Sequence, residues 1–371
     1  MQALYIHIPF CASICSYCDF CAIKAPERLH GEYVSLLLKE IDLRANGGLK
    51  NFETAYLGGG SPSAFSVENL QKLLAGLQKQ GLQARELKEF SMEWNPEQAS
   101  KEKIEIALDF GINRFSLGIQ SLNDNLLKIL GRNHSAKTAL NAFEKLSQSF
   151  SMGNCDLMFC LPCQSTENFL SDAKTLVELN AKHISFYGLT LESNSMLLQQ
   201  IRKKKIPQQP EDLYPEMYIK AAEFLRAAGL ERYEVSNFAL PCHESKHNMA
   251  YWQRKPYLGI GPSAHSYLHG IRYSNPRNYL PWALWVKNGC PESGLSIDVP
   301  EEKGREIEAV WLALRTREGL SLNGYEREFG KKFDLSKAEH FIKKGWLALN
   351  EDNLHLSNEG WLWLDRIFLH F

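Results

Sequence analysis

The chain has 371 residues, of which 44% are hydrophobic and 23% are charged, and its formal net charge is −1. This composition is typical of a folded protein with about two or three domains, and the near-zero charge argues against a dedicated nucleic-acid binder. No apolar run reaches the roughly 20 residues that a membrane helix needs, and the start, MQALYIHIPF, lacks the features of a signal peptide. Nine cysteines in such a chain argue against a disulfide framework, so we expect a cytoplasmic protein.

Short β-rich segments alternate with helical patterns through the first half of the chain. The predicted strands cover residues 3–8, 54–58, 89–94, 113–119, 155–159 and 183–188. Helical periodicity between them predicts helices over residues 31–45, 66–81 and 166–179. Strands that alternate with helices at this spacing predict an α/β fold, a partial (βα)6 barrel of the TIM type.

The pattern changes after residue 200. A charged, proline-containing connection leads to a predicted helix near residues 213–228, followed by a loop-rich segment dense in aromatic residues and histidine. From residue 300, helical segments precede the hairpin-like WLALNEDNLHLS and a last helix, which is the order of a winged-helix-like α+β region. We therefore divide the chain into a barrel core (1–200), a family-specific segment (201–295) and a C-terminal winged-helix-like domain (296–371).

Polar or conformationally special residues follow every predicted strand. In chain order they are a cysteine cluster, GGGSP (58–62), Glu93, Gln120, Asp156, and Thr190 with Glu192. The loops after parallel strands converge on one mouth of a βα barrel, and that mouth carries the active site in such folds. The sequence therefore predicts a functional site at the carboxyl ends of the strands.

Four cysteines are crowded into the segment FCASICSYCDFCA, namely Cys11, Cys15, Cys18 and Cys21. Thiolates are soft ligands that select zinc, copper(I) or iron–sulfur clusters. Four ligands on one loop could close around a structural zinc ion. Three ligands would instead leave one iron of a cubane cluster without a protein thiolate, whereas ordinary clusters take four. The spacing alone thus leaves two alternatives, a closed zinc site and an iron–sulfur cluster with one open iron.

Several motifs in order then carry a resemblance to a known family. YIHIPFCASICSYCDF resembles the cluster loop of radical S-adenosylmethionine enzymes, and LGGGSPS resembles their glycine-rich segment. The match continues through SMEWNPE, GINRFSLGIQSLND, LGRNH, CDLMFCLPCQST, HISFYGLTLE, YEVSNFA and HNMAYW. Together they are similar to the HemW family of haem chaperones, close relatives of oxygen-independent coproporphyrinogen III oxidase.

The resemblance implies a set of cofactor ligands. Cys11, Cys15 and Cys18 would ligate a 4Fe-4S cluster, and S-adenosylmethionine would chelate the fourth iron and be cleaved by one electron from the cluster. The residues implied to line S-adenosylmethionine are Tyr5, Tyr17, Gly59, Gly60, Ser61, Glu93, Gln120, Arg132, Asp156 and Thr190. Glycines allow the backbone to approach the ligand closely, carboxylates and amides suit hydroxyl and amino groups, and the arginine fork suits a carboxylate.

A second predicted site lies in HNMAYW. His247 and Tyr251 are four residues apart and share one face if the segment is helical. In the HemW family the H-N-x-x-Y-W motif is associated with haem binding, and imidazole is a ligand of haem iron. The resemblance therefore implies haem as cargo, with His247 as its ligand.

The sequence departs from related proteins at Phe20, Cys160 and Cys163. Phe20 stands where the related oxidases carry a cysteine, and we expect Cys21, one residue later, to be a neighbour of the cluster rather than a ligand. Cys160 and Cys163 stand where relatives usually carry glycine, which puts the turn after the fifth strand in doubt. These two cysteines could be extra soft ligands, but we expect a buried pair of small side chains.

Three functions follow as hypotheses. The first is a haem chaperone that cleaves S-adenosylmethionine, takes electrons from a donor and delivers haem to haemoproteins, often at a membrane. The second is a coproporphyrinogen III oxidase; Phe20 and the absence of the oxidases' longer N-terminal extension argue against it. The third is a zinc-bound interaction module. Whether the chain is an enzyme in the usual sense is left open by the resemblance.

Overall fold

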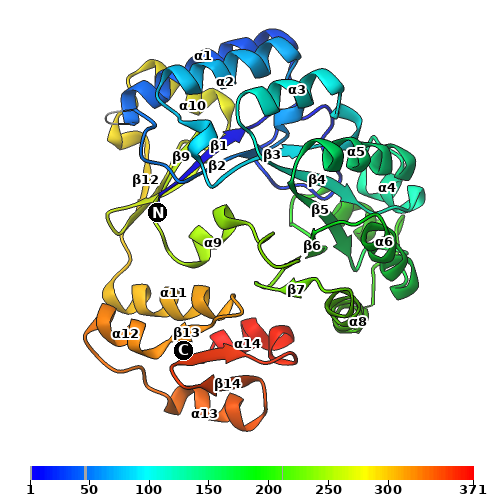
Figure 1. The fold of residues 1–371 in the computed structure, drawn as a ribbon, viewed down its shortest axis with the longest axis vertical. Helices are drawn as coiled ribbons and strands as arrows, with labels where there is room; N and C mark the ends of the chain where they lie inside the picture. Colours follow the sequence, from blue (N-terminus) through cyan, green and yellow to red (C-terminus); the bar gives the residue numbers. More distant parts are fainter. Residues whose placement is uncertain (1, 46–47, 211) are drawn as a thin grey trace.

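Six parallel strands form the centre of a curved sheet (Figure 1) in the computed structural model, which describes residues 2–45, 48–210 and 212–371. They pair in chain order: β1 (Ala3–Ile8), β2 (Thr54–Gly59), β3 (Glu89–Trp94), β4 (Arg114–Gln120), β5 (Met152–Phe159) and β6 (His183–Gly188). Helices cover the outer face: α1 (Glu27–Arg44), α2 (Val67–Lys79), α3 (Lys101–Asp109), α4 (Asp124–Leu130), α5 (Ala136–Ser149) and α6 (Thr166–Glu178). This arrangement confirms the predicted partial (βα)6 barrel.

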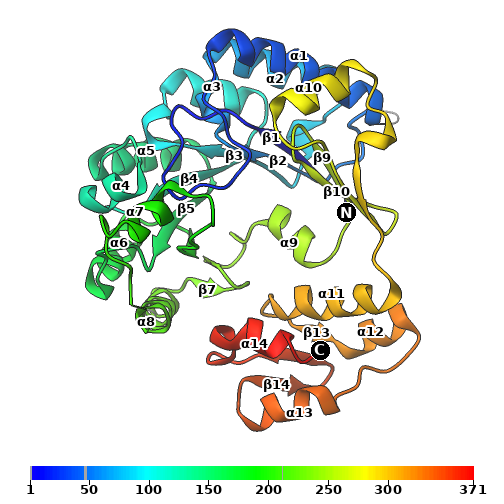
Figure 2. The same cartoon turned by 180° about the vertical axis from the view of Figure 1, so that it is seen from behind.

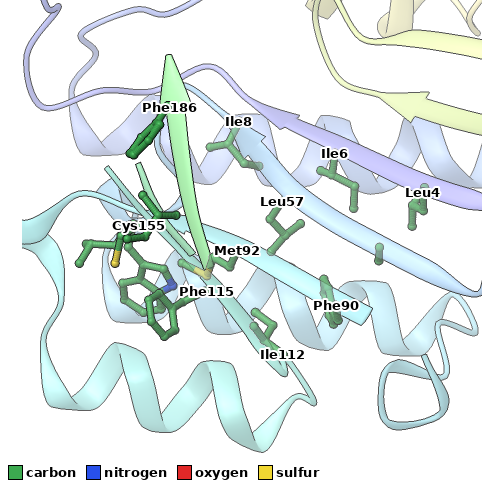
Figure 3. Packing of buried hydrophobic residues seen from close by; sticks show 14 of the residues in the cluster. Leu4, Ile6, Ile8, Leu57, Phe90, Met92, Ile112, Phe115, Cys155 and Phe186 are labelled. Carbon is green, nitrogen blue, oxygen red and sulfur yellow. The ribbon is translucent and has the colours of Figure 1, made fainter. Parts of the chain in front are cut away.

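The strands alternate between apolar and polar side chains. Even-numbered residues of β1, such as Leu4 and Ile6, are fully buried and belong to the hydrophobic core, which Figure 3 shows along the strands. In β3 and β4 the apolar set continues with Met92 and Phe115, and the intervening positions include the polar Ser116. Because successive side chains of a strand point to opposite faces, the concave face of the sheet is polar.

Short strands extend the sheet beyond the barrel at both edges. On one side are β9 (Tyr257–Ile260), parallel to β1, then β10 (His265–Leu268), β11 (Ile271–Ser274) and β12 (Ser296–Asp298); on the other are β8 (Asn237–Ala239) and β7 (Glu231–Arg232). The sequence predicts a loop-rich segment here without strands, and the structure adds β8, β9 and β10 within it. These strands have three or four residues each, too few for an alternating pattern to stand out.

The predicted helices are confirmed with small shifts at their ends. α1 begins at Glu27, directly after Pro26, rather than at residue 31. Ser66 caps α2 as its residue type suggests, because its hydroxyl accepts a hydrogen bond from the Asn69 amide at 3.2 Å. Farther along lie α7 (Met196–Arg202), the predicted helix α8 (Leu213–Ala227) and α10 (Tyr279–Lys287).

The C-terminal elements have the predicted order of helices, hairpin and last helix. They are α11 (Glu302–Leu314), β13 (Leu320–Ser321), α12 (Leu322–Phe329), α13 (Ser336–Lys343), β14 (Leu347–Asn350), β15 (Asn353–Leu356) and α14 (Leu364–Phe368). β13, β15 and β14 form a separate antiparallel sheet. Backbone hydrogen bonds join this region to the barrel, from Val235 to Arg315 and from Arg317 to Tyr233, each at 3.0 Å.

The helix α9 (Lys246–Trp252) lies on the concave side of the sheet, as both views of the ribbon show (Figure 2). None of the helices in the described part of the chain is long and apolar enough to cross a membrane.

Candidate functional site

A cavity of about 500 Å³ opens at the carboxyl ends of the strands. It is lined by the three predicted cluster ligands, Cys11, Cys15 and Cys18, and by these predicted S-adenosylmethionine residues: Tyr17, Gly59, Gly60, Ser61, Glu93, Gln120, Arg132, Asp156 and Thr190. The strand ends therefore bring together residues that lie far apart in the sequence, at the barrel face where the sequence predicts the site.

The cysteine loop is attached to the barrel at several points. At its base, the Cys11 amide donates a hydrogen bond to the Ile23 carbonyl at 3.0 Å. At its middle, the Ser16 amide donates to the Leu130 carbonyl at the end of α4, and the Leu197 amide at the start of α7 donates to the Ser16 carbonyl. These bonds hold the loop over the cavity, so the thiols share one wall.

The donor set fits an iron–sulfur cluster. Three thiols line one cavity, and burial raises the pKa of Cys11 to about 12 and also raises that of Cys18. Such thiols stay protonated until a metal displaces their protons. Among the residues that the structure describes, no group of three or more His, Cys, Asp or Glu side chains is already gathered closely enough to hold a metal ion.

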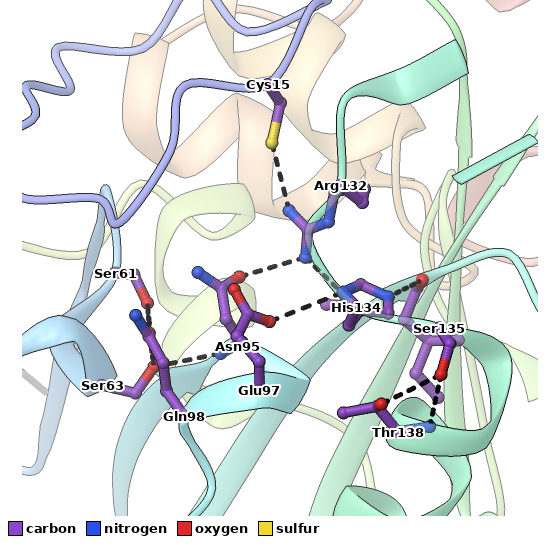
Figure 4. A network of polar contacts seen from close by, with 12 residues as sticks. Cys15, Ser61, Ser63, Asn95, Glu97, Gln98, Arg132, His134, Ser135 and Thr138 are labelled. Carbon is purple, nitrogen blue, oxygen red and sulfur yellow. Dashed lines mark hydrogen bonds and ion pairs between the residues drawn. The ribbon is translucent and has the colours of Figure 1, made fainter. Parts of the chain in front are cut away.

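Arg132 connects the cysteine wall with the strand ends (Figure 4). Its Nη1 donates to Cys15 Sγ at 3.5 Å, and its Nη2 donates to Asn95 Oδ1 at 3.0 Å and to the Gly118 carbonyl at 2.7 Å. Figure 4 also shows His134 close to Glu97, with His134 Nδ1 3.6 Å from Glu97 Oε2. The guanidinium is thus held in place beside a thiol before any ligand binds.

In the glycine-rich segment, close contacts and backbone conformation require glycine at two positions. A Cβ on Gly60 would lie 2.8 Å from the Phe10 carbonyl oxygen and 2.9 Å from that of Ile8. Gly59 has φ +113°, which side chains rarely adopt, and its amide donates to Glu93 Oε2 at 3.0 Å. These glycines let the cysteine loop and the strand ends pack together at the cavity.

Two buried carboxyl groups face the cavity. Burial raises the pKa of Glu93 to about 7, with the charge of Asp156 adding to the rise while hydrogen bonds from Tyr56 and Gly59 oppose it. Burial likewise raises the pKa of Asp156 to about 6 against hydrogen bonds from Asn154, Ser185 and Ser116. Both groups are hydrogen-bond acceptors in a poorly solvated wall, where a polar ligand group is bound strongly.

Several residues that line the cavity were not predicted from the sequence: Asn95, Ser116, Gly118, Met158 and Tyr187. Asn95, Gly118 and Met158 each lie two residues from a predicted residue, whereas Ser116 lies four residues before Gln120 and Tyr187 lies three residues before Thr190. Because strand side chains alternate, a step of two from Glu93, Gln120 or Asp156 would have found most of them.

Other predicted residues lie away from the cavity. Tyr5 is not among the lining residues; its hydroxyl donates to His7 Nδ1 at 3.0 Å, while His7 Nε2 donates to the Cys21 carbonyl at 2.9 Å. Cys21 does not line the cavity either, and its expected role as a neighbour of the cluster stays a prediction.

The expectation of a buried cysteine pair after β5 was wrong. Cys163 is exposed and Cys160 is half-buried, because both lie in a surface turn. Cys160 has φ +59° and Cys163 has φ +66°, a backbone conformation that favours glycine. The turn after β5 therefore forms even though cysteine occupies both positions. Neither cysteine lines the cavity.

His247 lies on α9, outside the cavity and 1% exposed. Its Nδ1 is 3.0 Å from Thr54 Oγ1, and its Nε2 is 2.9 Å from the Tyr251 hydroxyl. Both ring nitrogens are therefore engaged, and ligation of haem iron by His247 stays a prediction that requires one of these hydrogen bonds to be lost.

The chain resembles known proteins along its whole length. The profile of the Radical SAM superfamily matches residues 5–176, and that of the HemN C-terminal domain matches residues 304–363. The heme chaperone HemW of Lactococcus lactis is 33% identical over 100% of this chain and 97% of its own length, and that of Bacillus subtilis is 33% identical over 99% and 98%. The Mus musculus protein called radical S-adenosyl methionine domain-containing protein 1, mitochondrial, is 37% identical over 99% and 86%.

One solved structure shares the fold of the entire chain. The coproporphyrinogen III oxidase HemN of Escherichia coli superposes with a TM-score of 0.87 over 100% of this chain and 89% of its own, at 21% identity. At that identity the likeness concerns the fold, whereas the similarity to the HemW proteins covers the sequence. The chain belongs to the HemW family of the Radical SAM superfamily.

Proposed function

We propose that this protein is a haem chaperone, which binds haem and transfers it to haemoproteins. The observation that carries the proposal is the three-thiol cavity with an apolar mouth, in a chain whose full-length relatives bear the name heme chaperone. When bound, a 4Fe-4S cluster on Cys11, Cys15 and Cys18 supplies the electron for reductive cleavage of S-adenosylmethionine. The proposed partners are an electron donor for the cluster and a haemoprotein that accepts haem. Action in the cytoplasm or at a membrane surface stays a prediction.

The cavity residues suit S-adenosylmethionine. Glu93, Gln120 and Asp156 offer oxygen acceptors for ribose hydroxyls and an amino group, and Arg132 offers a planar fork for a carboxylate. The two hydrogen bonds from Arg132 Nη2 to Asn95 and Gly118 orient that fork in advance, which lowers the cost of ordering it on binding.

Arg132→Lys tests this assignment. Lysine keeps the positive charge but loses the fork and the bonds that orient it, so we expect S-adenosylmethionine to bind about tenfold more weakly to the cluster-loaded protein. Equilibrium dialysis measures the dissociation constant. Arg85→Lys is the matched control, since that exposed side chain donates only to the Asp109 carbonyl among the described residues. Equal affinities of the wild type and Arg132→Lys would remove Arg132 from the site.

The mouth of the cavity offers apolar surface to a flat macrocycle. Among its lining residues, Ile14, Phe20 and Tyr187 are 38%, 75% and 41% exposed. Large exposed apolar side chains around a cavity mark a binding surface rather than a core. We propose that haem lies against this rim, with Phe20 as the side chain that it covers most.

An anaerobic experiment separates chaperone from oxidase. We expect the cluster-loaded protein to bind haemin, and Phe20→Ser to weaken that binding by roughly 10- to 150-fold because a buried aromatic contact of about 1.5–3 kcal/mol is lost. Given S-adenosylmethionine, a reductant and coproporphyrinogen III, the protein should yield no protoporphyrinogen. Sustained turnover without haemin binding would favour the oxidase, and a zinc-containing protein without sulfide would favour the interaction module.

A further inference from the structure

The H-N-x-x-Y-W helix, α9, is attached at the amino end of the barrel, opposite the cavity mouth. Glu89 begins β3, and its Oε1 accepts a hydrogen bond from the Ser245 hydroxyl at 2.9 Å while its Oε2 accepts one from the Lys246 amide at 2.7 Å. Thr54, which contacts His247, begins β2. The motif is therefore attached to the floor of the barrel, at the amino ends of β2 and β3.

A continuous chain of contacts leads from this floor to the cavity. The His247 ring stacks on the Tyr56 ring, with centroids 5.2 Å apart and planes at 28°. The Tyr56 hydroxyl donates to Glu93 Oε1 at 2.9 Å, and Glu93 Oε2 accepts the Gly59 amide at 3.0 Å. Glu93 lines the cavity, so the position of its carboxyl group depends on the ring beneath it.

The His247 ring is itself held rigidly. One nitrogen contacts Thr54 and the other contacts Tyr251, whose ring meets the His247 ring edge-on at 5.1 Å. Burial lowers the pKa of His247 to about 4, so the ring is neutral and stacks on Tyr56 without charge. A ring fixed on both edges and covering the face of Tyr56 restricts the directions in which the Tyr56 hydroxyl can point.

We propose that His247 is a positioning residue of the S-adenosylmethionine cavity, acting through the Tyr56 ring on the carboxyl group of Glu93. The inference rests on the proposed binding of S-adenosylmethionine by Glu93. It assigns to the H-N-x-x-Y-W motif a task that needs no contact between His247 and a haem.

Four variants test the inference in the cluster-loaded protein, with equilibrium dialysis of S-adenosylmethionine as the readout. Tyr56→Phe removes the donor to Glu93, and His247→Ala removes the ring beneath Tyr56; we expect each to weaken binding by roughly tenfold or more. The double variant should bind S-adenosylmethionine no more weakly than the single variant with the lower affinity, because both changes break the same chain of contacts. His247→Phe keeps a ring against Tyr56 and should restore affinity to within about threefold of the wild type.

Lys246→Ala is the matched control on α9, because that exposed side chain leaves the backbone bond to Glu89 intact. Haemin affinity, measured in parallel, separates the two roles of His247. The inference would be overturned if His247→Ala bound S-adenosylmethionine normally while His247→Phe no longer bound haemin. That result would still support the proposed haem chaperone. If His247→Ala does not fold, unchanged affinity in Tyr56→Phe overturns the inference by itself. Wild-type protein that binds no S-adenosylmethionine would refute the proposed cofactor, and the inference with it.

Discussion

Replacing Cys15 with serine is expected to abolish assembly of the 4Fe-4S cluster. With three protein thiolates for four irons, one iron already lacks a protein ligand, and removal of Cys15 leaves a second one bare. Serine is a hard oxygen ligand that iron–sulfur clusters accept poorly. After anaerobic reconstitution, iron and sulfide analysis and the visible absorption band should show nearly complete loss.

The cysteines outside the cavity serve as controls for this loss. Cys21→Ser and Cys163→Ser should retain the cluster, because neither side chain lines the cavity. Cys11→Ser and Cys18→Ser should behave like Cys15→Ser, since the three share one wall. A full complement of iron and sulfide in all three cavity variants would show that the ligand assignment is wrong.

Glu40→Ala is expected to lower the free energy of unfolding by about 3–5 kcal/mol, the usual cost of breaking a buried charge pair. Glu40 is fully buried on α1, and its Oε1 accepts from Arg44 Nη1 at 2.5 Å and from Asn275 Nδ2 at 2.8 Å. Its Oε2 accepts from the Gly261 amide at 2.9 Å and from Trp282 Nε1 at 2.8 Å. One carboxyl group thus joins α1 to the turn after β9, the end of β11 and α10, and its loss leaves the largely buried Arg44 without the counter-charge that Glu40 supplies.

Urea titration of the apoprotein measures this loss against a matched control. Glu32 lies on the same helix and also reaches α10, through Lys287 at 3.0 Å, but both side chains are about half exposed. Solvent screens such a pair, so Glu32→Ala should cost less than about 1 kcal/mol. Similar small losses for both variants would contradict the role given to Glu40.

The barrel was predictable because its signals are local. β1, β3 and β6 occupy the predicted ranges 3–8, 89–94 and 183–188, and β4 is shifted by a single residue. Buried parallel strands and amphipathic helices each carry their own periodicity, and their alternation fixes the pairing order. The position of the site was predictable for the same reason. Glu93, Gln120 and Asp156 lie at the ends of successive parallel strands, and such strand ends meet at one mouth of the barrel.

What the sequence could not predict depends on contacts between distant segments. The partners of His247 are Thr54 and Tyr56, which belong to a strand almost two hundred positions earlier, and no local pattern marks their proximity. The edge strands β9 to β12 are ordered by pairing with β1 and with each other rather than by their own composition. Cys163 was misplaced because residue type favours burial for cysteine, whereas the turn after β5 holds it at the surface.

The measurement that tests the account most directly is the electron paramagnetic resonance spectrum of the anaerobically reconstituted, reduced protein with and without S-adenosylmethionine. An iron that lacks a thiolate can accept the amino and carboxylate groups of the added molecule, so the account predicts a cluster signal that changes when S-adenosylmethionine is added. A cluster signal that is unaffected by saturating S-adenosylmethionine, or a protein that holds zinc and no sulfide, would contradict it.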